Sequence, residues 1–203
     1  SWYDFDPKYK GGYRSWWGFE TLPEVNEETP SFVEFITGEG GVIDTWLRRG
    51  AAGFRLDVAD ELPDDFIEKI RAAVKRVSPE KFLLGEVWED ATTKYGFGQR
   101  RTYLLGRGLD SVMNYPFKNA VLDFVKGKPA QQAMGEILSI CEHYPAPAMD
   151  TALNFLSTHD TERALTVIAD EPANGRGREW QSGRCVTGEA YEEGMLRLRM
   201  AYA

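Results

Sequence analysis

Four short apolar segments, each followed by a helical pattern, constrain the fold of this 203-residue chain more than any other feature. The expected strands are residues 52–59, 81–88, 109–115 and 151–158. The helical patterns are residues 63–77, 117–125, 130–143 and 189–203, with another over 32–47 that is interrupted at 38–41. Strands that alternate with helices predict a parallel sheet with right-handed crossovers. Residues 95–105 are ambiguous, and a short helix is one interpretation of them.

A parallel sheet of four strands fits either a doubly wound fold or part of a (β/α)8 barrel. A doubly wound fold usually has a glycine-rich phosphate turn after its first strand, whereas this chain has Asp60-Glu61-Leu62-Pro63 there. A whole barrel needs about 250 residues. The sequence therefore predicts an α/β fold, roughly half of a (β/α)8 barrel. Residues 1–31, rich in aromatic, glycine, proline and acidic residues, are expected to form an ordered loop region.

Charge and composition exclude several classes of partner. The net charge is −8, and the densest basic group, Gln99-Arg100-Arg101, is too short for a nucleic-acid interface. No apolar run has the length of a membrane span. The soft ligands Cys141, Cys185, His143 and His159 are too few and too scattered for a zinc site, so no metal or organic cofactor is expected, and pairing of the cysteines stays open. The 6 Trp, 9 Tyr and 11 Phe would suit either the apolar faces of sugar rings or a core.

Three acidic residues at predicted strand ends are candidates for chemistry. Arg55 and Asp57 lie two apart on the first strand, so their side chains should share one face and pair. Glu86 lies near the end of the second strand after apolar residues, where burial would raise its pKa as a general acid requires. Asp160 follows the fourth strand. Taken singly, each has a structural alternative: a buried ion pair, a capping glutamate, and the N-cap of a helix that begins near Thr161.

Together, the three acidic residues favour catalysis. The carboxyl ends of parallel strands share one rim of a barrel, and barrel enzymes have their active sites on that rim. A carboxylate nucleophile beside a carboxylic acid is the pair that a retaining glycosidase needs. We therefore expect Asp57, Glu86 and Asp160 to form an active site.

At these residues the sequence resembles the α-amylase family of glycoside hydrolases. Residues 53–61 (GFRLDVADE), 85–88 (GEVW) and 154–160 (NFLSTHD) resemble the family's nucleophile, acid/base and third-carboxylate segments, in the family's order. The resemblance implies that Asp57 attacks the anomeric carbon to form a covalent glycosyl intermediate and that Glu86 is the acid/base. It also implies that Asp160 binds sugar hydroxyls, that Arg55 orients Asp57, and that His159 hydrogen-bonds the sugar.

Further segments are similar to the neopullulanase, cyclomaltodextrinase and maltogenic amylase group. They are residues 13–19 (YRSWWGF), 22–26 (LPEVN), 57–61 (DVADE) and 113–117 (MNYPF). The resemblance implies hydrolysis of α-1,4 links in cyclomaltodextrins, pullulan, maltooligosaccharides or starch. The alternatives are an α-1,6-glucosidase or transglycosylase of the same family, or a non-catalytic glucan-binding relative. Trp88, Tyr115 and Trp17 are hypothetical stacking residues for glucosyl units, with core packing as an equal alternative for Tyr115.

The family's segments around its first three barrel strands, and its eighth strand, have no counterpart in the chain. The resemblance therefore implies a piece of a longer parent: residues 1–31 as the tail of the loop domain inserted after strand three, and residues 32–203 as the C-terminal half of the barrel without its last strand. Such a piece is expected to have little or no activity alone, and its open edges would favour pairing between copies. Calcium, which some relatives bind, has no compact oxygen-ligand loop here. A cytoplasmic location is expected, with a periplasmic or secreted one as the alternative.

Overall fold

The computed structural model describes residues 1–169 and 173–203 and divides the chain into two units. Unit 1 comprises Ser1–Glu86 and Tyr95–Asp110, and unit 2 comprises Val87–Lys94 and Ser111–Ala203. The domain boundary expected at residue 31 stays a prediction.

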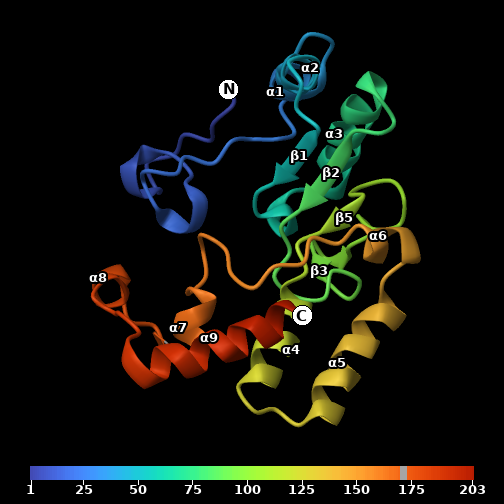
Figure 1. The fold of residues 1–203 in the computed structure, drawn as a ribbon. Coiled ribbons are helices and arrows are strands. Elements are labelled where there is room, and N and C mark those ends of the chain that lie inside the picture. Colours follow the sequence, from blue (N-terminus) through green and yellow to red (C-terminus); the bar gives the residue numbers. More distant parts are fainter. Residues whose placement is uncertain (170–172) are drawn as a thin grey trace. The chain divides into compact units, whose positions relative to one another are not determined.

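Two parallel strands organise unit 1 (Figure 1). β1 (Gly53–Leu56) pairs with β2 (Phe82–Gly85) in parallel, from Gly53 opposite Phe82 to Leu56 opposite Gly85. α3 (Asp64–Val77) connects the strands and packs against β2. Its buried face consists of Phe66, Ile67, Ile70, Ala73 and Val74. The predicted strand–helix–strand unit is confirmed.

Both strands are shorter than the sequence predicted. β1 ends before Asp57 because the backbone turns at Val58, whose φ is 43°, into a 3-10 helix, η3 (Ala59–Glu61). Glycine is required at Gly53, the first residue of β1, since a Cβ there would collide with the carbonyl oxygen of Phe82. The short strands are therefore closely packed, and the residues after them are held in turns.

Two short helices precede β1, as the interrupted pattern over residues 32–47 predicted. α1 (Pro30–Thr37) and α2 (Val42–Arg48) pack against each other and against α3. The segment before α1 is an ordered loop held by isolated bridges, and it contains the 3-10 turns η1 (Lys10–Gly12) and η2 (Trp16–Gly18). This confirms the expectation of ordered irregular structure over residues 1–31, except that α1 already begins at Pro30.

The interpretation of residues 95–105 as a short helix is wrong. β3 (Tyr95–Gly96) and β4 (Gln99–Arg100) form an antiparallel hairpin. Its two turn residues, Phe97 and Gly98, have φ values of 52° and 77°. A two-residue turn with both φ values positive matches the twist of the flanking strands and excludes a helix.

Unit 2 is mainly helical. Its elements are β5 (Ser111–Val112), α4 (Tyr115–Val125), α5 (Ala130–His143), α6 (Ala146–Asp150), α7 (Ala164–Ala169), α8 (Arg178–Ser182) and α9 (Gly188–Tyr202). α4 and α5 form a helical hairpin, and α4, α7 and α9 pack together (Figure 1). A cluster of Leu122, Val125, Leu156, Ala164 and Ile168 forms the core of this packing. The predicted helices 117–125, 130–143 and 189–203 are confirmed.

The third and fourth predicted strands are reduced. After β5, Met113 forms a single parallel bridge with Leu153, and the expected strand over 151–158 has no other paired residue in the described parts of the chain. Leu153 is 45% exposed, so this segment lacks the burial on both faces that stabilises a central parallel strand. The parallel direction of the pairing is nevertheless as predicted.

Two further expectations concern the surface. Cys141 and Cys185 are both exposed free thiols, which answers the open question of their pairing. None of the described helices is long and apolar enough to cross a membrane.

Acid is expected to weaken unit 1 through Asp110. Its carboxylate accepts hydrogen bonds from Arg71 (2.7 Å), Lys75 (2.8 Å) and the backbone N–H of Leu83 (2.8 Å). Burial opposes its ionisation, but Lys75 and Arg71 outweigh burial, so the pKa of Asp110 lies below its usual value. The resulting stabilisation is complete above the unfolded pKa of about 3.9 and is lost as the pH falls through the lower folded pKa.

Asp110→Asn should therefore lower the free energy of unfolding by about 2 kcal/mol at pH 7. The difference from wild type should shrink between pH 4 and pH 3, which urea unfolding at pH 7, 5 and 3 measures. Asp65→Asn, a change of an exposed α3 carboxylate, is the control. A difference that stays constant across this range would contradict the prediction.

Candidate active site

The register of β1 and β2 places Asp57 and Glu86 next to each other. Leu56 lies opposite Gly85, and Asp57 and Glu86 are the residues that follow them. The backbone N–H of Glu86 donates to the carbonyl of Leu56 at 3.0 Å, and that of Ala59 donates to the carbonyl of Glu86 at 3.1 Å. The two acidic residues therefore lie at the same carboxyl edge of the parallel strands, as predicted.

Arg55 joins the two carboxylates. Its Nη1 pairs with Oδ1 of Asp57, and its Nη2 lies 2.9 Å from Oε1 of Glu86. The sequence predicted an Arg55–Asp57 pair on one buried strand face, and the pair is present. However, the Asp57 side chain is 76% exposed because it lies beyond the strand end, whereas Glu86 is 4% exposed. The buried carboxylate is therefore Glu86, and Asp57 is open to solvent.

Strained backbone supports Glu86. Val58, a β-branched residue, has the left-handed φ of 43°, a conformation that costs about 1–3 kcal/mol. This conformation directs its N–H to Oε2 of Glu86 at 2.9 Å. Both oxygens of the buried Glu86 carboxylate are thus occupied, one by Arg55 and one by Val58.

A buried arginine that sequence reasoning missed holds the segment after Asp57. The Arg101 side chain is 1% exposed; it pairs with Asp64 at 2.8 Å and donates to the carbonyls of Asp60 and Leu62, the latter at 2.6 Å. Tyr103 donates to the Asp60 carboxylate at 3.2 Å, and burial raises the pKa of Tyr103 far above its usual value. These partners lie about 40 positions away along the chain, so no local pattern indicated them.

Asp57 lines a pocket of about 510 Å³ in unit 1. Trp16, Glu61 and Phe66 are among the other lining residues. Trp17 stacks on Trp16 with ring centroids 4.8 Å apart, and it is 75% exposed. The predicted stacking residue Trp17 is thus accessible and close to a pocket that contains Asp57.

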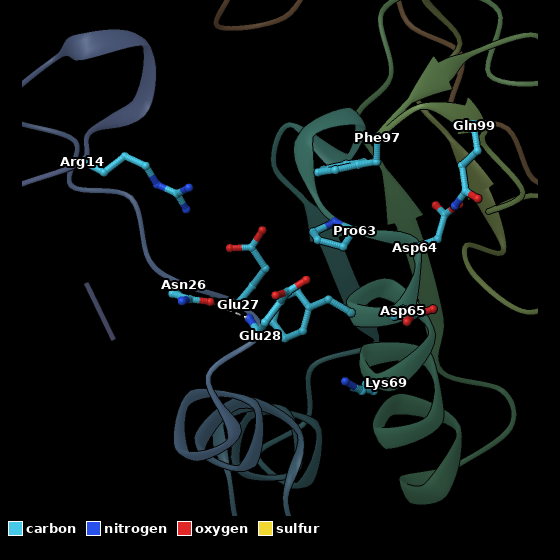
Figure 2. A pocket seen from close by; sticks show the side chains of 11 residues that line it. Arg14, Asn26, Glu27, Glu28, Pro63, Asp64, Asp65, Lys69, Phe97 and Gln99 are labelled. Carbon is cyan, nitrogen blue, oxygen red and sulfur yellow. Dashed lines mark hydrogen bonds between the residues drawn. The ribbon is translucent and has the colours of Figure 1, made fainter. Parts of the chain in front are cut away.

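A second pocket of unit 1 adjoins the first, since Glu27 and Phe66 line both. Its volume is about 570 Å³, and acidic side chains are prominent in its lining (Figure 2). Arg14 lines it as well and pairs with Glu24 at 3.1 Å. None of the predicted catalytic or stacking residues lines this second pocket.

In unit 2, three predicted site residues share one pocket. Trp88, His159 and Asp160 all line a pocket of about 830 Å³. Nε2 of His159 lies 3.0 Å from Oδ2 of Asp160, and both side chains are exposed. α7 begins at Ala164, so the alternative of a helix that begins near Thr161 with Asp160 as its N-cap is wrong.

Tyr115 is a core residue. Of the two roles that the sequence allowed for it, sugar stacking and core packing, the structure shows core packing. It is 1% exposed, and its ring stacks on Trp88 at 4.6 Å with an interplanar angle of 13°. Phe155 packs edge-on against it at 4.8 Å. Trp88 is 45% exposed and backed by Tyr115, so Trp88 is the residue of this pair with an accessible ring.

The loop that follows Glu86 is held to the end of α5. Nδ1 of His143 lies 2.6 Å from Oδ2 of Asp90, and the backbone N–H of Ala91 donates to the Tyr144 hydroxyl at 3.0 Å. Burial raises the pKa of Tyr144 to about 12, so this hydroxyl stays protonated at neutral pH. The sequence indicated His143 only as a possible zinc ligand, and the structure shows that it helps to position the loop that carries Trp88.

Within residues 1–169 and 173–203, no group of three or more His, Cys, Asp or Glu side chains is arranged to hold a metal ion.

Comparison with known proteins defines the class to which this fold belongs. Residues 10–182 match the family described as alpha amylase, catalytic domain. The chain is 35% identical over 204 residues to an amylopullulanase of Thermoanaerobacter thermohydrosulfuricus, a match that covers 86% of this chain and 13% of the relative. It is 37% identical over 155 residues to a cyclomaltodextrinase of a Bacillus species, covering 73% of this chain and 25% of the relative.

The structural comparison agrees. The type III pullulan hydrolase from Thermococcus kodakarensis superimposes with a TM-score of 0.77 at 25% identity, covering 98% of this chain and 32% of that one. The chain therefore belongs to the α-amylase catalytic-domain family of glycoside hydrolases, and the prediction of part of a (β/α)8 barrel is confirmed. It spans 13% of the length of the amylopullulanase and 25% of the length of the cyclomaltodextrinase.

Proposed function

We propose that this chain carries catalytic residues of a retaining α-glucan hydrolase that cleaves α-1,4-glucosidic bonds through a covalent glycosyl intermediate on Asp57. The observation that supports this most is the pair of carboxylates, Asp57 and Glu86, that follow opposed strand residues and share the cation of Arg55. A retaining glycosidase needs one carboxylate as nucleophile and a second carboxyl group as acid and then base.

The exposure of the two carboxylates supports the proposed division of roles. Asp57 is mostly exposed, so an anomeric carbon can approach its oxygen, and Arg55 pairs with it. Glu86 is buried beside Arg55, and a retaining glycosidase needs its second carboxyl group as the acid and then the base. Asp57 is therefore the nucleophile and Glu86 the acid/base.

The shared cation fits the proton balance of the double displacement. In the first step Asp57 is ionised and Glu86 gives its proton to the leaving oxygen. In the glycosyl intermediate Asp57 is an uncharged ester and Glu86 is ionised, so that it takes a proton from the attacking water. The pair carries one negative charge in both states, and Arg55, which contacts both side chains, offsets that charge throughout.

Unit 2 supplies the proposed sugar-binding residues. Asp160 and His159 are exposed polar groups that line one pocket with Trp88, whose ring is supported by Tyr115. In the proposal Asp160 and His159 hydrogen-bond sugar hydroxyls, and Trp88 stacks on the apolar face of a glucosyl unit. In unit 1, Trp17 is proposed to stack on a different glucosyl residue of the substrate, beside the pocket that contains Asp57.

A substrate panel tests the proposal on the full-length protein that contains these residues. Cyclomaltodextrin, pullulan, starch and isomaltose are supplied separately, and products are followed by proton NMR. The proposal predicts products from the α-1,4-linked substrates with the α configuration at the newly formed reducing end. Turnover of isomaltose alone would instead favour the α-1,6-glucosidase alternative, and new glycosidic links would favour transglycosylation. No turnover would favour a glucan-binding scaffold.

A further inference from the structure

We infer that Glu61 is a positioning residue that fixes the stacked Trp16 and Trp17 rings beside Asp57 and thereby sets the affinity for glucosyl units bound next to the cleaved bond. The inference rests on the proposed function and extends it to a residue outside the three carboxylates.

One carboxylate holds both indoles. Nε1 of Trp16 donates to Oε2 of Glu61 at 2.7 Å, and Nε1 of Trp17 donates to Oε1 at 3.1 Å. The two rings are nearly parallel, with an interplanar angle of 14°. Two bonds to two oxygens of one planar group fix the orientation of the pair, which one bond would leave free to rotate.

The backbone of Trp17 is strained, which indicates that its contacts with Trp16 and Glu61 hold it in this conformation. Trp17 has φ 49° and ψ 23°, the left-handed region that a bulky side chain rarely occupies. The ring is nevertheless 75% exposed, so burial of the indole does not compensate for the strain. The contacts that hold it are the stack on Trp16 and the bond to Glu61. Strained residues that present an exposed side chain are concentrated at ligand-binding sites.

Glu61 is itself held in relation to Asp57. It lies four residues after Asp57, in η3, and its N–H donates to the carbonyl of Val58 at 2.9 Å. The buried Arg101 donates to the carbonyls of Asp60 and Leu62 on either side of it. The segment from Asp57 to Glu61 is thus short and held in place. Glu61, and with it the two indoles, therefore has a fixed position relative to Asp57.

The location of the rings defines the ligand class. Trp16, Glu61 and Asp57 line the same pocket, so a chain whose anomeric carbon reaches Asp57 has its neighbouring units close to the Trp pair. Flat aromatic faces bind the apolar faces of pyranose rings. The affected ligands are therefore oligosaccharides long enough to extend past the cleaved bond.

The experiment compares a long and a short substrate on the full-length protein. Maltoheptaose reaches the Trp pair, whereas 4-nitrophenyl α-maltoside leaves fewer glucosyl units to do so. We expect Glu61→Ala to raise KM for maltoheptaose about tenfold with kcat within about twofold, because two charge-assisted hydrogen bonds are lost. KM for the short maltoside should change by less than about twofold.

Two conservative variants and one control separate positioning from folding. Trp17→Phe keeps a ring but removes its N–H, and Glu61→Gln keeps one acceptor oxygen, so both should raise KM for maltoheptaose by less than Glu61→Ala. Glu68→Gln changes an α3 glutamate that pairs with Arg107 instead of an indole, and it should leave both KM values unchanged. Calorimetric titration of maltoheptaose into each variant on an Asp57→Asn background measures the same effect without turnover.

An active wild type whose maltoheptaose KM and Kd are unaffected by Glu61→Ala would overturn the inference and leave the proposed function intact. Equal losses of kcat on both substrates would also overturn it, since they would indicate a general structural role. A wild type that neither cleaves nor binds maltoheptaose would overturn both the inference and the proposed function.

Discussion

Asp57→Asn is expected to lower kcat by about 10⁴-fold, because an amide cannot form the glycosyl ester. The folded state should be little affected, since the Asp57 side chain is 76% exposed and leaves no buried gap when it is changed. Arg55 keeps its second partner, Glu86, at 2.9 Å. The measurement is kcat and KM for maltoheptaose, with the melting temperature recorded for each variant.

Asp65→Asn is the matched control for this change. Asp65 is also an exposed aspartate of unit 1, in the first turn of α3, and it lies outside the pocket that contains Asp57. Its kcat should equal that of wild type within about twofold. Retention of most activity by Asp57→Asn, at an unchanged melting temperature, would exclude Asp57 as the nucleophile.

Glu86→Gln is expected to lower kcat on maltoheptaose by about 10³-fold while the protein still binds the sugar. Glutamine retains the shape of the buried side chain and can still accept the N–H of Val58, but it cannot transfer a proton. The loss of kcat/KM should be much smaller on α-maltosyl fluoride, because fluoride departs without protonation and kcat/KM does not include the later step in which Glu86 acts as base. The values of kcat/KM on both substrates and a calorimetric Kd for maltoheptaose measure this difference.

Glu89→Gln is the control for the second change, since Glu89 lies in the same loop and its side chain is 65% exposed. It should leave both rates unchanged. An equal loss of kcat/KM on both substrates in Glu86→Gln would contradict an acid role for Glu86. Lost binding together with a lowered melting temperature would mean that Glu86 is structural.

The helices and the strand ends were predictable because their signals are local. The apolar spacing of α3, α4, α5 and α9 is visible in a window of about four turns, and so is the change from an apolar strand to an acidic residue at Asp57 and Glu86. Glycine and a short polar segment likewise indicated the break between α1 and α2. These features need no knowledge of distant residues.

The features that the sequence did not indicate depend on distant partners. The hairpin of β3 and β4 requires a positive φ at Phe97. Phenylalanine is not among the residue types that indicate such a turn. The exposure of Asp57 follows from the turn at Val58. The roles of Arg101 and Glu61 depend on partners about 40 positions away, and a single sequence contains no record of those pairings. The prediction of a full strand over 151–158 is wrong, since its pairing is limited to one bridge.

Asp57 is proposed to become covalently glycosylated, and trapping the glycosyl ester is the sharpest check of that proposal. The full-length protein is incubated with 5-fluoro-α-D-glucosyl fluoride, digested, and analysed by tandem mass spectrometry. We expect a fluoroglucosyl label on the peptide that contains Asp57, with the fragment ions assigning it to that residue and with no label in Asp57→Asn. A label on another carboxylate, or hydrolysis that releases products of the β configuration, would contradict it.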